Sequence, residues 1–301
     1  MTAQPASPTP IVAALHDLSC FGRCALTVIL PTLSAMGLQA VPVPTALLST
    51  HTGGFTDMHF RDLSDDMIAI ADHFLSLRLH FDALYSGFLG SARQIGIVEN
   101  FFERFRAPDT VVLVDPVMGD DGVLYSTYTK ELQEGMKRLC RHADVITPNL
   151  TEACFLSGTA YRDTSHMNER EAEAFAASLC DRLHETLGTP RIVLTGLPFD
   201  GRVGTFSSDK SAGTEQAHFY HAPRQPKNFP GTGDIFASVL LGKLLSGMTL
   251  ADASAFAADF TGTTIAHSQN TTAPLRDGVL LERELYRLCP ASSPKKQDET
   301  R

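Results

Sequence analysis

Short apolar runs alternate with longer amphipathic stretches along most of the chain. The apolar runs are rich in valine and isoleucine and end at Gly, Pro or a polar residue: "IVAAL" (11–15), "AVPVP" (40–44), "DALYSGF" (82–88), "TVVLVDP" (110–116), "DVITP" (144–148) and "RIVLTG" (191–196). Such runs are typical of strands buried on both faces of a parallel sheet. The stretches between them have helical periodicity, over residues 61–79, 91–106, 129–141 and 168–187. This alternation predicts an α/β sandwich with a mostly parallel sheet.

The pattern changes after residue 196. "GRVGTFSS" (201–208) and "AHFYHAP" (217–223) predict two antiparallel edge strands joined by a polar loop. Helices are then expected over 233–246 and 249–268, with a final helix near 278–288. No linker or internal repeat interrupts the chain. We therefore expect a single domain over 11–288, a disordered lead-in over 1–10 and a disordered tail over 289–301.

Composition and charge exclude two classes of protein. The chain has 301 residues, of which 43% are hydrophobic and 20% charged, and its formal net charge is −9 with no basic stripe. These values argue against a nucleic-acid-binding protein. The apolar stretches, such as "CALTVILPTLSAM", are shorter than the roughly 20 residues that span a bilayer. The six cysteines include no C-x-x-C pair, which favours reduced thiols in the cytoplasm over disulfides or zinc.

Acidic and small polar residues follow the predicted strands. Ligands of open α/β sheets bind outside the carboxyl ends of the strands, so these residues are expected to meet at one rim. Asp115, Asp120 and Glu152 suit a magnesium–nucleotide site, because Mg²⁺ prefers one or two carboxylates plus water and phosphate oxygens. Asn149 and Thr195 could donate hydrogen bonds to the phosphates. Taken one at a time, these residues are better explained by structure alone, Asp115 by a strand-ending turn and Glu152 as a first-turn acid; it is their convergence on one rim that favours a site.

The stretch "GTGDIFAS" (231–238) places an acid at a helix N-terminus, where anions are normally favoured. Gly231 and Gly233 would allow the backbone N–H groups to approach a phosphate closely. Asp234 would then act beside this anion hole as a base that takes a proton from an attacking hydroxyl. A plain helix cap at Asp234 is an equal alternative. The chain lacks the P-loop pattern and the dinucleotide-binding fingerprint.

Together these motifs resemble those of a known enzyme family. "GTGDIFAS", "DPVMGDDGVLY" and "ITPNLTEACFLSG" resemble the ribokinase superfamily, and "HDLSCFGRCAL" and "PVPTALLSTHTGGF" resemble its pyridoxal (vitamin B6) kinases, over about residues 11–288. The resemblance implies a ribokinase-like three-layer α/β/α sandwich. It also implies ATP-dependent phosphorylation of the 5′-hydroxymethyl group of pyridoxal, pyridoxamine or pyridoxine. Mg²⁺ bound with ATP, a monovalent cation (K⁺ or Na⁺), a homodimer and a cytoplasmic location follow from it too.

The resemblance also assigns roles to residues of this chain. Asp234 would be the base, and the anion hole would consist of Gly231, Thr232 and Gly233. The magnesium–ATP phosphates would be held by Asp115, Asp120, Asn149 and Glu152, with Thr195 near them. The vitamer would be contacted by Asp17, Thr45, His51 and Phe88. In addition, Gly53–Gly54 could be a lid hinge or an ordinary turn, and residues 271–275 could border the adenine.

Two positions depart from the pyridoxal kinase pattern. Asp17 replaces a serine, and Phe88 replaces a tyrosine. Hydroxymethylpyrimidine kinases of the same superfamily also carry an aspartate in the loop that contains Asp17, which makes a hydroxymethylpyrimidine kinase the alternative enzyme. A non-catalytic protein that binds vitamer or nucleotide is the alternative from another class.

Overall fold

The computed structural model describes residues 9–125, 128–213 and 215–290. Most of the predicted lead-in and tail, residues 1–8 and 291–301, therefore lies outside the described residues. The strands are β1 (Ile11–Phe21), β2 (Gln39–Thr50), β3 (Phe60–Asp62), β4 (Ala83–Ser86), β5 (Val111–Val114), β6 (Gly119–Asp120), β7 (Val123–Leu124), β8 (Val145–Ile146), β9 (Arg191–Phe199), β10 (Arg202–Asp209) and β11 (Gln216–Pro223). The α-helices are α1 (Leu26–Ala35), α2 (Ser64–Ser76), α3 (Ala92–Phe105), α4 (Lys130–Arg141), α5 (Leu150–Ser157), α6 (Glu169–Leu187), α7 (Thr232–Leu245) and α8 (Leu250–Ser268). Short 3₁₀ turns occur between β10 and β11 at η1 (Ser211–Gly213) and after α8 at η2 (Leu275–Asp277), η3 (Leu281–Arg283) and η4 (Leu285–Leu288).

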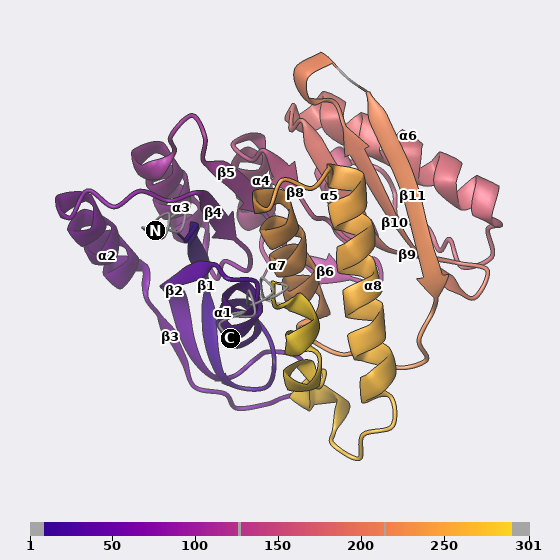
Figure 1. Cartoon of the computed structure of the whole chain (residues 1–301), viewed down its shortest axis with the longest axis horizontal. Coiled ribbons are helices and arrows are strands. Elements are labelled where there is room, and N and C mark those ends of the chain that lie inside the picture. The colour runs from indigo at the N-terminus through magenta and orange to yellow at the C-terminus, as the bar shows by residue number, and fades with distance from the viewer. Residues whose placement is uncertain (1–8, 126–127, 214, 291–301) are drawn as a thin grey trace, which may run out of the picture.

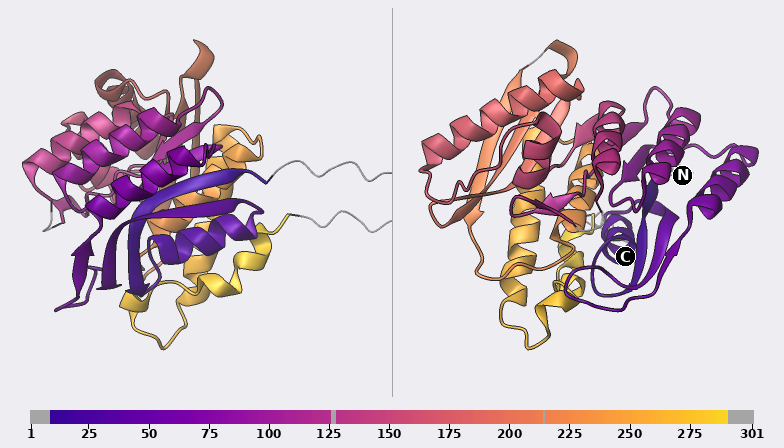
Figure 2. Two further views of the ribbon diagram at one scale, coloured as in Figure 1. Left: turned by 90° about the vertical axis from the view of Figure 1, so that its left-hand side faces the viewer. Right: turned by 180° about the vertical axis from the view of Figure 1, so that it is seen from behind.

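A nine-stranded sheet runs through the molecule in the order β11-β10-β9-β8-β5-β4-β1-β2-β3. The strands from β9 to β2 pair in parallel, whereas β3, β10 and β11 pair antiparallel with their neighbours. Helices α2 to α6 pack on one face, and α1, α7 and α8 pack on the other. Figures 1 and 2 show the sheet between these two helical layers. The three-layer α/β/α sandwich is thus confirmed.

The six parallel strands and the antiparallel pair at one edge also occur where the sequence predicts them. Helix α1 was not predicted. Its sequence is apolar, contains β-branched residues and carries Pro31 within the helix, so it lacks the usual helical signals. It forms because its buried side chains pack against α7 and the sheet.

The expected α-helix near 278–288 is wrong in type, because η3 and η4 occupy this segment. The Leu280 N–H donates to the Ser268 hydroxyl of α8 instead of to a helical carbonyl. Val279, Leu281 and Leu288 are buried against the second helical layer. Tertiary contacts therefore determine the path of this segment.

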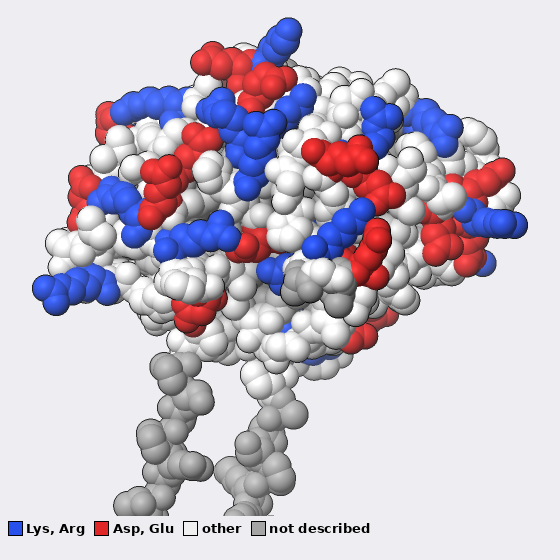
Figure 3. All heavy atoms as spheres, turned by 90° about the horizontal axis from the view of Figure 1, so that it is seen from above, with Lys and Arg blue, Asp and Glu red and all other residues white. Residues whose placement is uncertain are grey.

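Charged side chains of both signs occur on the surface. On the face shown in Figure 3, Lys and Arg side chains lie interspersed with Asp and Glu. Among the described residues, none of the helices combines the length and apolar character needed to cross a membrane. All six cysteines are free thiols, and four of them are buried.

Candidate active site

A cavity of about 590 Å³ lies at the carboxyl ends of the parallel strands, next to the N-terminus of α7. This volume is within the usual range for a small-molecule site. All but one of the predicted site residues line it: Asp17, His51, Phe88, Asp115, Asp120, Asn149, Glu152, Thr195, Gly231, Thr232, Gly233 and Asp234. The expectation that polar strand ends meet at one rim is confirmed.

Gly231 precedes the first turn of α7 in a left-handed conformation with φ +79°. A Cβ at this position would lie 2.0 Å from the carbonyl oxygen of Arg23, so both the conformation and the space require glycine. Gly233 has more room, because its Cβ would meet only Oδ2 of Asp115, at 3.8 Å. The first N–H groups of a helix have no carbonyl partner within the helix, and Gly231, Thr232 and Gly233 at the start of α7 line the cavity.

Asp234 is the third residue of α7 and is half-buried at the cavity wall. Its Oδ2 accepts a 2.8 Å hydrogen bond from the backbone N–H of Ala25, which lies just before α1. The helix is capped at Gly231, without a side-chain hydrogen bond. The plain-cap explanation for Asp234 is therefore excluded, and its carboxylate is oriented by a distant segment.

Burial raises the pKa of Asp234 to about 8, and the negative charges of Asp115 and Asp17 add to the rise. The hydrogen bond from Ala25 acts in the opposite direction. A carboxyl group with a pKa near 8 is well matched to accepting a proton near neutral pH.

Asp115 and Glu152 are buried carboxyl groups of the same wall. Oδ1 of Asp115 accepts a hydrogen bond from the Thr147 hydroxyl at 2.9 Å, and burial raises its pKa to about 7. Glu152 accepts from the N–H groups of Met118 and Asn149, at 3.0 and 2.8 Å, with one oxygen each. Burial and the charge of Asp115 raise the pKa of Glu152 well above its usual value. Oδ2 of Asp115 therefore lies near Gly233, whereas both carboxylate oxygens of Glu152 accept hydrogen bonds from backbone N–H groups.

Asn149 is also engaged within the protein. Its Oδ1 accepts from the Glu152 N–H at 2.9 Å, which completes a capping box at the start of α5. Its Nδ2 donates to the Gly119 carbonyl at 2.9 Å, next to Asp120 of β6. The backbone of Thr195 pairs with that of Asn149 in a parallel bridge. Asn149 therefore fixes the loop that carries Asp120. Both of its side-chain polar atoms, Oδ1 and Nδ2, form hydrogen bonds to the backbone of the protein.

The cavity is lined by more acidic than basic residues. Its acidic lining residues are Asp17, Asp115, Asp120, Asp121, Glu152 and Asp234, and its basic ones are Arg224 and Lys227. Among the ion pairs of the described part of the chain, none involves Asp115, Glu152 or Asp234. This unpaired charge suits a divalent cation. Residues 9–125, 128–213 and 215–290 hold no cluster of three or more His, Cys, Asp or Glu side chains for a metal, and Mg²⁺ shared with phosphates and water does not need one.

Asp17 lies within β1, at a shift in its register with β2, and Phe88 follows the end of β4; both line the cavity. The Ser19 hydroxyl donates a 2.8 Å hydrogen bond to Oδ2 of Asp17. Burial raises the pKa of Asp17 above its usual value. An acidic group and a partly exposed aromatic ring in one cavity are suited to a heteroaromatic ligand.

His51 is buried, and both of its ring nitrogens contact backbone atoms. Nε2 donates to the Arg276 carbonyl at 2.6 Å, and Nδ1 accepts from the Gly53 N–H at 3.0 Å. These contacts fix the Nε2–H tautomer. The ring therefore lines the cavity without a free nitrogen for a ligand.

Thr45 is the predicted site residue that the structure does not bring into the cavity. It is fully buried in β2. Its carbonyl accepts hydrogen bonds from Nε2 of Gln94 and from the Leu63 N–H. Residues 271–275 are likewise absent from the cavity lining, and their place beside a nucleotide base stays a prediction.

Three residues of the site were not predicted. Ala25 contacts Asp234 only after folding, and no sequence signal marks it. Arg224 and Lys227 line the cavity on the loop before α7. They stand in "RQPKNFPGTGD", so basic residues directly upstream of the glycine motif were a signal that could have been used.

Known proteins resemble this chain in sequence and fold. Residues 26–275 match the family described as phosphomethylpyrimidine kinase. The pyridoxine/pyridoxal/pyridoxamine kinase of Bordetella avium is 30% identical over 254 residues, which are 79% of each protein. A crystal structure from Bacteroides thetaiotaomicron, provisionally named a phosphomethylpyrimidine kinase and crystallised with pyridoxal, is 37% identical. It has a TM-score of 0.84 and covers 93% of this chain and 96% of its own. Pyridoxal kinase from Lactobacillus plantarum is 32% identical with a TM-score of 0.80, over 94% and 97% of the two chains.

Proposed function

This chain belongs to the phosphomethylpyrimidine kinase family and to its pyridoxal kinases, in the ribokinase superfamily, and we propose that it phosphorylates the 5′-hydroxymethyl group of a vitamin B6 vitamer with ATP. It is accordingly a phosphotransferase with an alcohol acceptor. The observation that carries the proposal is the position of Asp234, beside the anion site at the start of α7 and with a raised pKa. The relative crystallised with pyridoxal supports the choice of acceptor.

In the proposed reaction, Asp234 accepts the proton of the hydroxymethyl group. The hydroxyl oxygen forms a bond to the γ-phosphorus of ATP while the bond from that phosphorus to the ADP oxygen breaks. Charge on the transferred group is received by the N–H groups at Gly231, Thr232 and Gly233. Arg224, which lies on the cavity rim, is available to the phosphates.

Asp115 is the residue best placed to hold Mg²⁺ with ATP, because one of its oxygens has no hydrogen bond within the described part of the chain. The ion would supply neutralisation of phosphate charge. Glu152 would contribute chiefly its negative charge, and Asp120 a nearby carboxylate. Asn149 would keep their loops in place, with Thr195 beside it.

Asp17 and Phe88 are proposed to contact the ring of the vitamer, with His51 forming part of the pocket wall. A carboxyl at position 17 can pair with a ring nitrogen or a ring hydroxyl. Thr45 is omitted, since it lies outside the cavity.

Hydroxymethylpyrimidine is the second candidate acceptor, because the matching family is described as phosphomethylpyrimidine kinase and Asp17 suits either ring. The test is ADP release with magnesium–ATP and, separately, pyridoxal, pyridoxamine, pyridoxine and hydroxymethylpyrimidine. The proposal expects turnover with the pyridines. Preference for the pyrimidine would replace the acceptor and leave the role of Asp234 intact, and no turnover with any of them would favour a non-catalytic binding protein.

We also propose that the protein is a cytoplasmic homodimer assisted by K⁺ or Na⁺, as the resemblance to pyridoxal kinases implies. Exposed apolar side chains on β3 and α2, including Phe60, Ile68 and Leu75, support self-association. Sedimentation velocity would measure the oligomeric state, and activity in Tris buffer with and without KCl would measure the cation requirement.

A further inference from the structure

Arg276 makes three contacts with the loop that follows β2. Its carbonyl accepts the 2.6 Å hydrogen bond from His51. Its guanidinium donates to the Gly54 carbonyl at 3.2 Å and lies over the Phe55 ring, 4.7 Å from the centroid. The His51 and Phe55 rings meet edge to face, with centroids 4.9 Å apart. One residue from the C-terminal segment therefore contacts three residues of the loop, His51, Gly54 and Phe55.

This loop forms the end of the cavity where the vitamer is proposed to bind. His51, Thr52 and Gly53 line the cavity directly. Gly22 lies against the same edge of the His51 ring, where an added Cβ would be 2.4 Å from the ring carbon Cδ2 and 3.6 Å from the Arg276 carbonyl oxygen. The position of His51 therefore depends on its contact with Gly22 and on its hydrogen bond to the Arg276 carbonyl.

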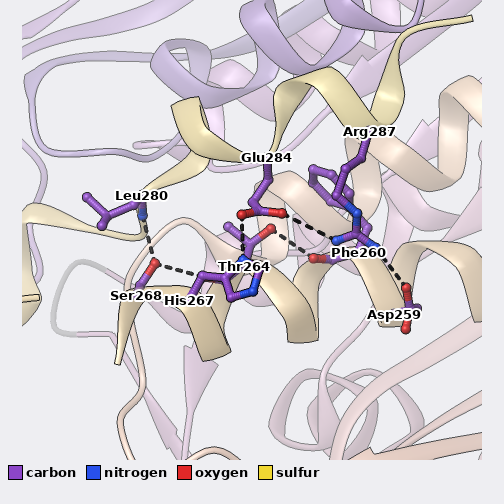
Figure 4. A network of polar contacts seen from close by, with 8 residues as sticks. All are labelled: Asp259, Phe260, Thr264, His267, Ser268, Leu280, Glu284 and Arg287. Carbon is purple, nitrogen blue, oxygen red and sulfur yellow. Dashed lines mark hydrogen bonds and ion pairs between the residues drawn. The ribbon is translucent and has the colours of Figure 1, made fainter. Parts of the chain in front are cut away.

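The C-terminal segment that carries Arg276 is itself held firmly on α8. Figure 4 shows Glu284 between His267 and Arg287. Arg287 also pairs with Asp259, and the Leu280 N–H donates to the Ser268 hydroxyl. Glu284 is only 3% exposed, so the carboxylate at the centre of this anchor is buried, whereas its partner His267 is exposed.

A second anchor joins the same segment to the loop before α1. Arg23 donates from its N–H and from Nη1 to the Asp277 carbonyl, at 3.2 and 3.1 Å, and from Nε to Glu282 at 2.8 Å. The segment around Arg276 is therefore a fixed support, whereas Thr52, Gly53 and Gly54 are exposed.

We propose that Arg276 is a positioning residue for substrate binding, which holds the His51–Phe55 loop against the vitamer end of the cavity. The proposal rests on the proposed function, since it assigns this loop to the vitamer and not to ATP. Arg276 does not line the cavity, so it acts through His51, Gly54 and Phe55.

Arg276→Ala removes the guanidinium and keeps the carbonyl that binds His51. Loss of one cation–π contact and one hydrogen bond predicts a roughly 5- to 30-fold rise in KM for the vitamer. KM for ATP and the melting temperature should stay at wild-type values, because the side chain is exposed and lies outside the cavity. Amide hydrogen exchange should increase in residues 52–57 and not in α8.

Three further variants test whether the effect on KM is specific to the Arg276 side chain. Arg283→Ala, in the same segment, removes an exposed arginine that has no contact with the loop among the described residues, and should leave KM unchanged. Arg276→Lys should restore part of the vitamer affinity, because it keeps a cation near Phe55. Phe55→Leu should raise KM, and adding it to Arg276→Ala should cost less than the product of the two single effects.

The outcomes separate this inference from the function itself. Wild-type protein that turns over a vitamer, together with an Arg276→Ala variant of unchanged vitamer KM and unchanged exchange, would overturn the role of Arg276 alone. An equal rise in KM for ATP and vitamer would also overturn it, because a general structural effect would then suffice. Wild-type protein inactive with every vitamer would instead refute the proposed function.

Discussion

The backbone N–H of Ala25 donates a 2.8 Å hydrogen bond to Oδ2 of Asp234, joining the start of α1 to the start of α7. Ala25 adopts φ 48° and ψ −135°, a conformation that favours glycine. Strain of this kind persists where the surrounding structure fixes it, often at functional sites. Here it directs a donor at the proposed base, so that the carboxylate is oriented before substrate binds.

Gly231→Ala should damage both folding and catalysis. The new Cβ would collide with the Arg23 carbonyl at 2.0 Å, in the loop that leads to Ala25. We expect a loss of about 1–3 kcal/mol in unfolding free energy and a lower kcat, because the N–H groups of α7 shift. Thermal melting and steady-state kinetics would measure these effects.

Gly201→Ala is the matched control for this change. Gly201 also has a positive φ, of +68°, but an added Cβ there meets no atom within 4 Å. The Gly201→Ala variant should lose unfolding free energy through its unfavourable backbone conformation, but its kcat should stay at the wild-type value. Equal behaviour of the two variants would mean that the contact with Arg23 is unimportant.

The pH dependence of kcat/KM should report the ionisation of Asp234. The base must be deprotonated to act, and its pKa is raised to about 8. In a pH series with pyridoxine, kcat/KM should therefore rise with pH and level off above this pKa. Higher Mg²⁺ should move the midpoint downward, since nearby positive charge favours the carboxylate. A kcat/KM that declines between pH 6 and pH 8 would rule out Asp234 as the base.

Asp115→Asn should stabilise the protein without ligand while reducing phosphoryl transfer. The folded-state pKa of about 7 is above the unfolded value of about 3.9. The unfolded chain therefore binds fewer protons between these values, and wild-type stability falls as pH rises through this window. The amide carries no charge and keeps an acceptor for Thr147. We expect the melting temperature of Asp115→Asn to be roughly 2–6 °C above that of wild type at pH 8, and equal to it near pH 4. A melting temperature below that of wild type at pH 8 would contradict the account.

Thiol labelling should divide the cysteines by burial. Cys20 and Cys289 are exposed, whereas the other four are buried. Burial raises the pKa of the Cys24 thiol, and the charges of Asp234 and Asp17 raise it further. Iodoacetamide should therefore modify Cys20 and Cys289 in the native protein and spare Cys24. Peptide mass spectrometry would locate the labels, and rapid modification of Cys24 would show that the cavity wall opens.

Much of the architecture was predictable because its signals are local. Valine-rich strands and amphipathic helices are periodic in the sequence, and acids that follow parallel strands must meet at one edge of the sheet. The convergence of Asp115 and Glu152 followed from that rule, whereas Asp234 lies in α7 and was placed by its glycine motif. Helix α1 was missed because tertiary packing forms it against weak local preference.

The remaining features depend on contacts between distant segments. Nothing near Ala25 or Arg276 in the sequence indicates that they contact Asp234 and the His51 loop. Thr45 shows the converse, since a residue placed by resemblance lies buried away from the cavity and bonds to Gln94. Such relationships are fixed by three-dimensional packing, which a local pattern does not encode.

The most direct test of the central claim is the turnover of Asp234→Asn, with the product measured as vitamer 5′-phosphate by mass spectrometry at saturating magnesium–ATP and vitamer. Asparagine keeps an acceptor for the Ala25 N–H and removes the base. We expect kcat to fall roughly 10²- to 10⁴-fold, with vitamer affinity close to wild type by calorimetry. A variant with wild-type kcat would contradict the role of Asp234 and the mechanism built on it.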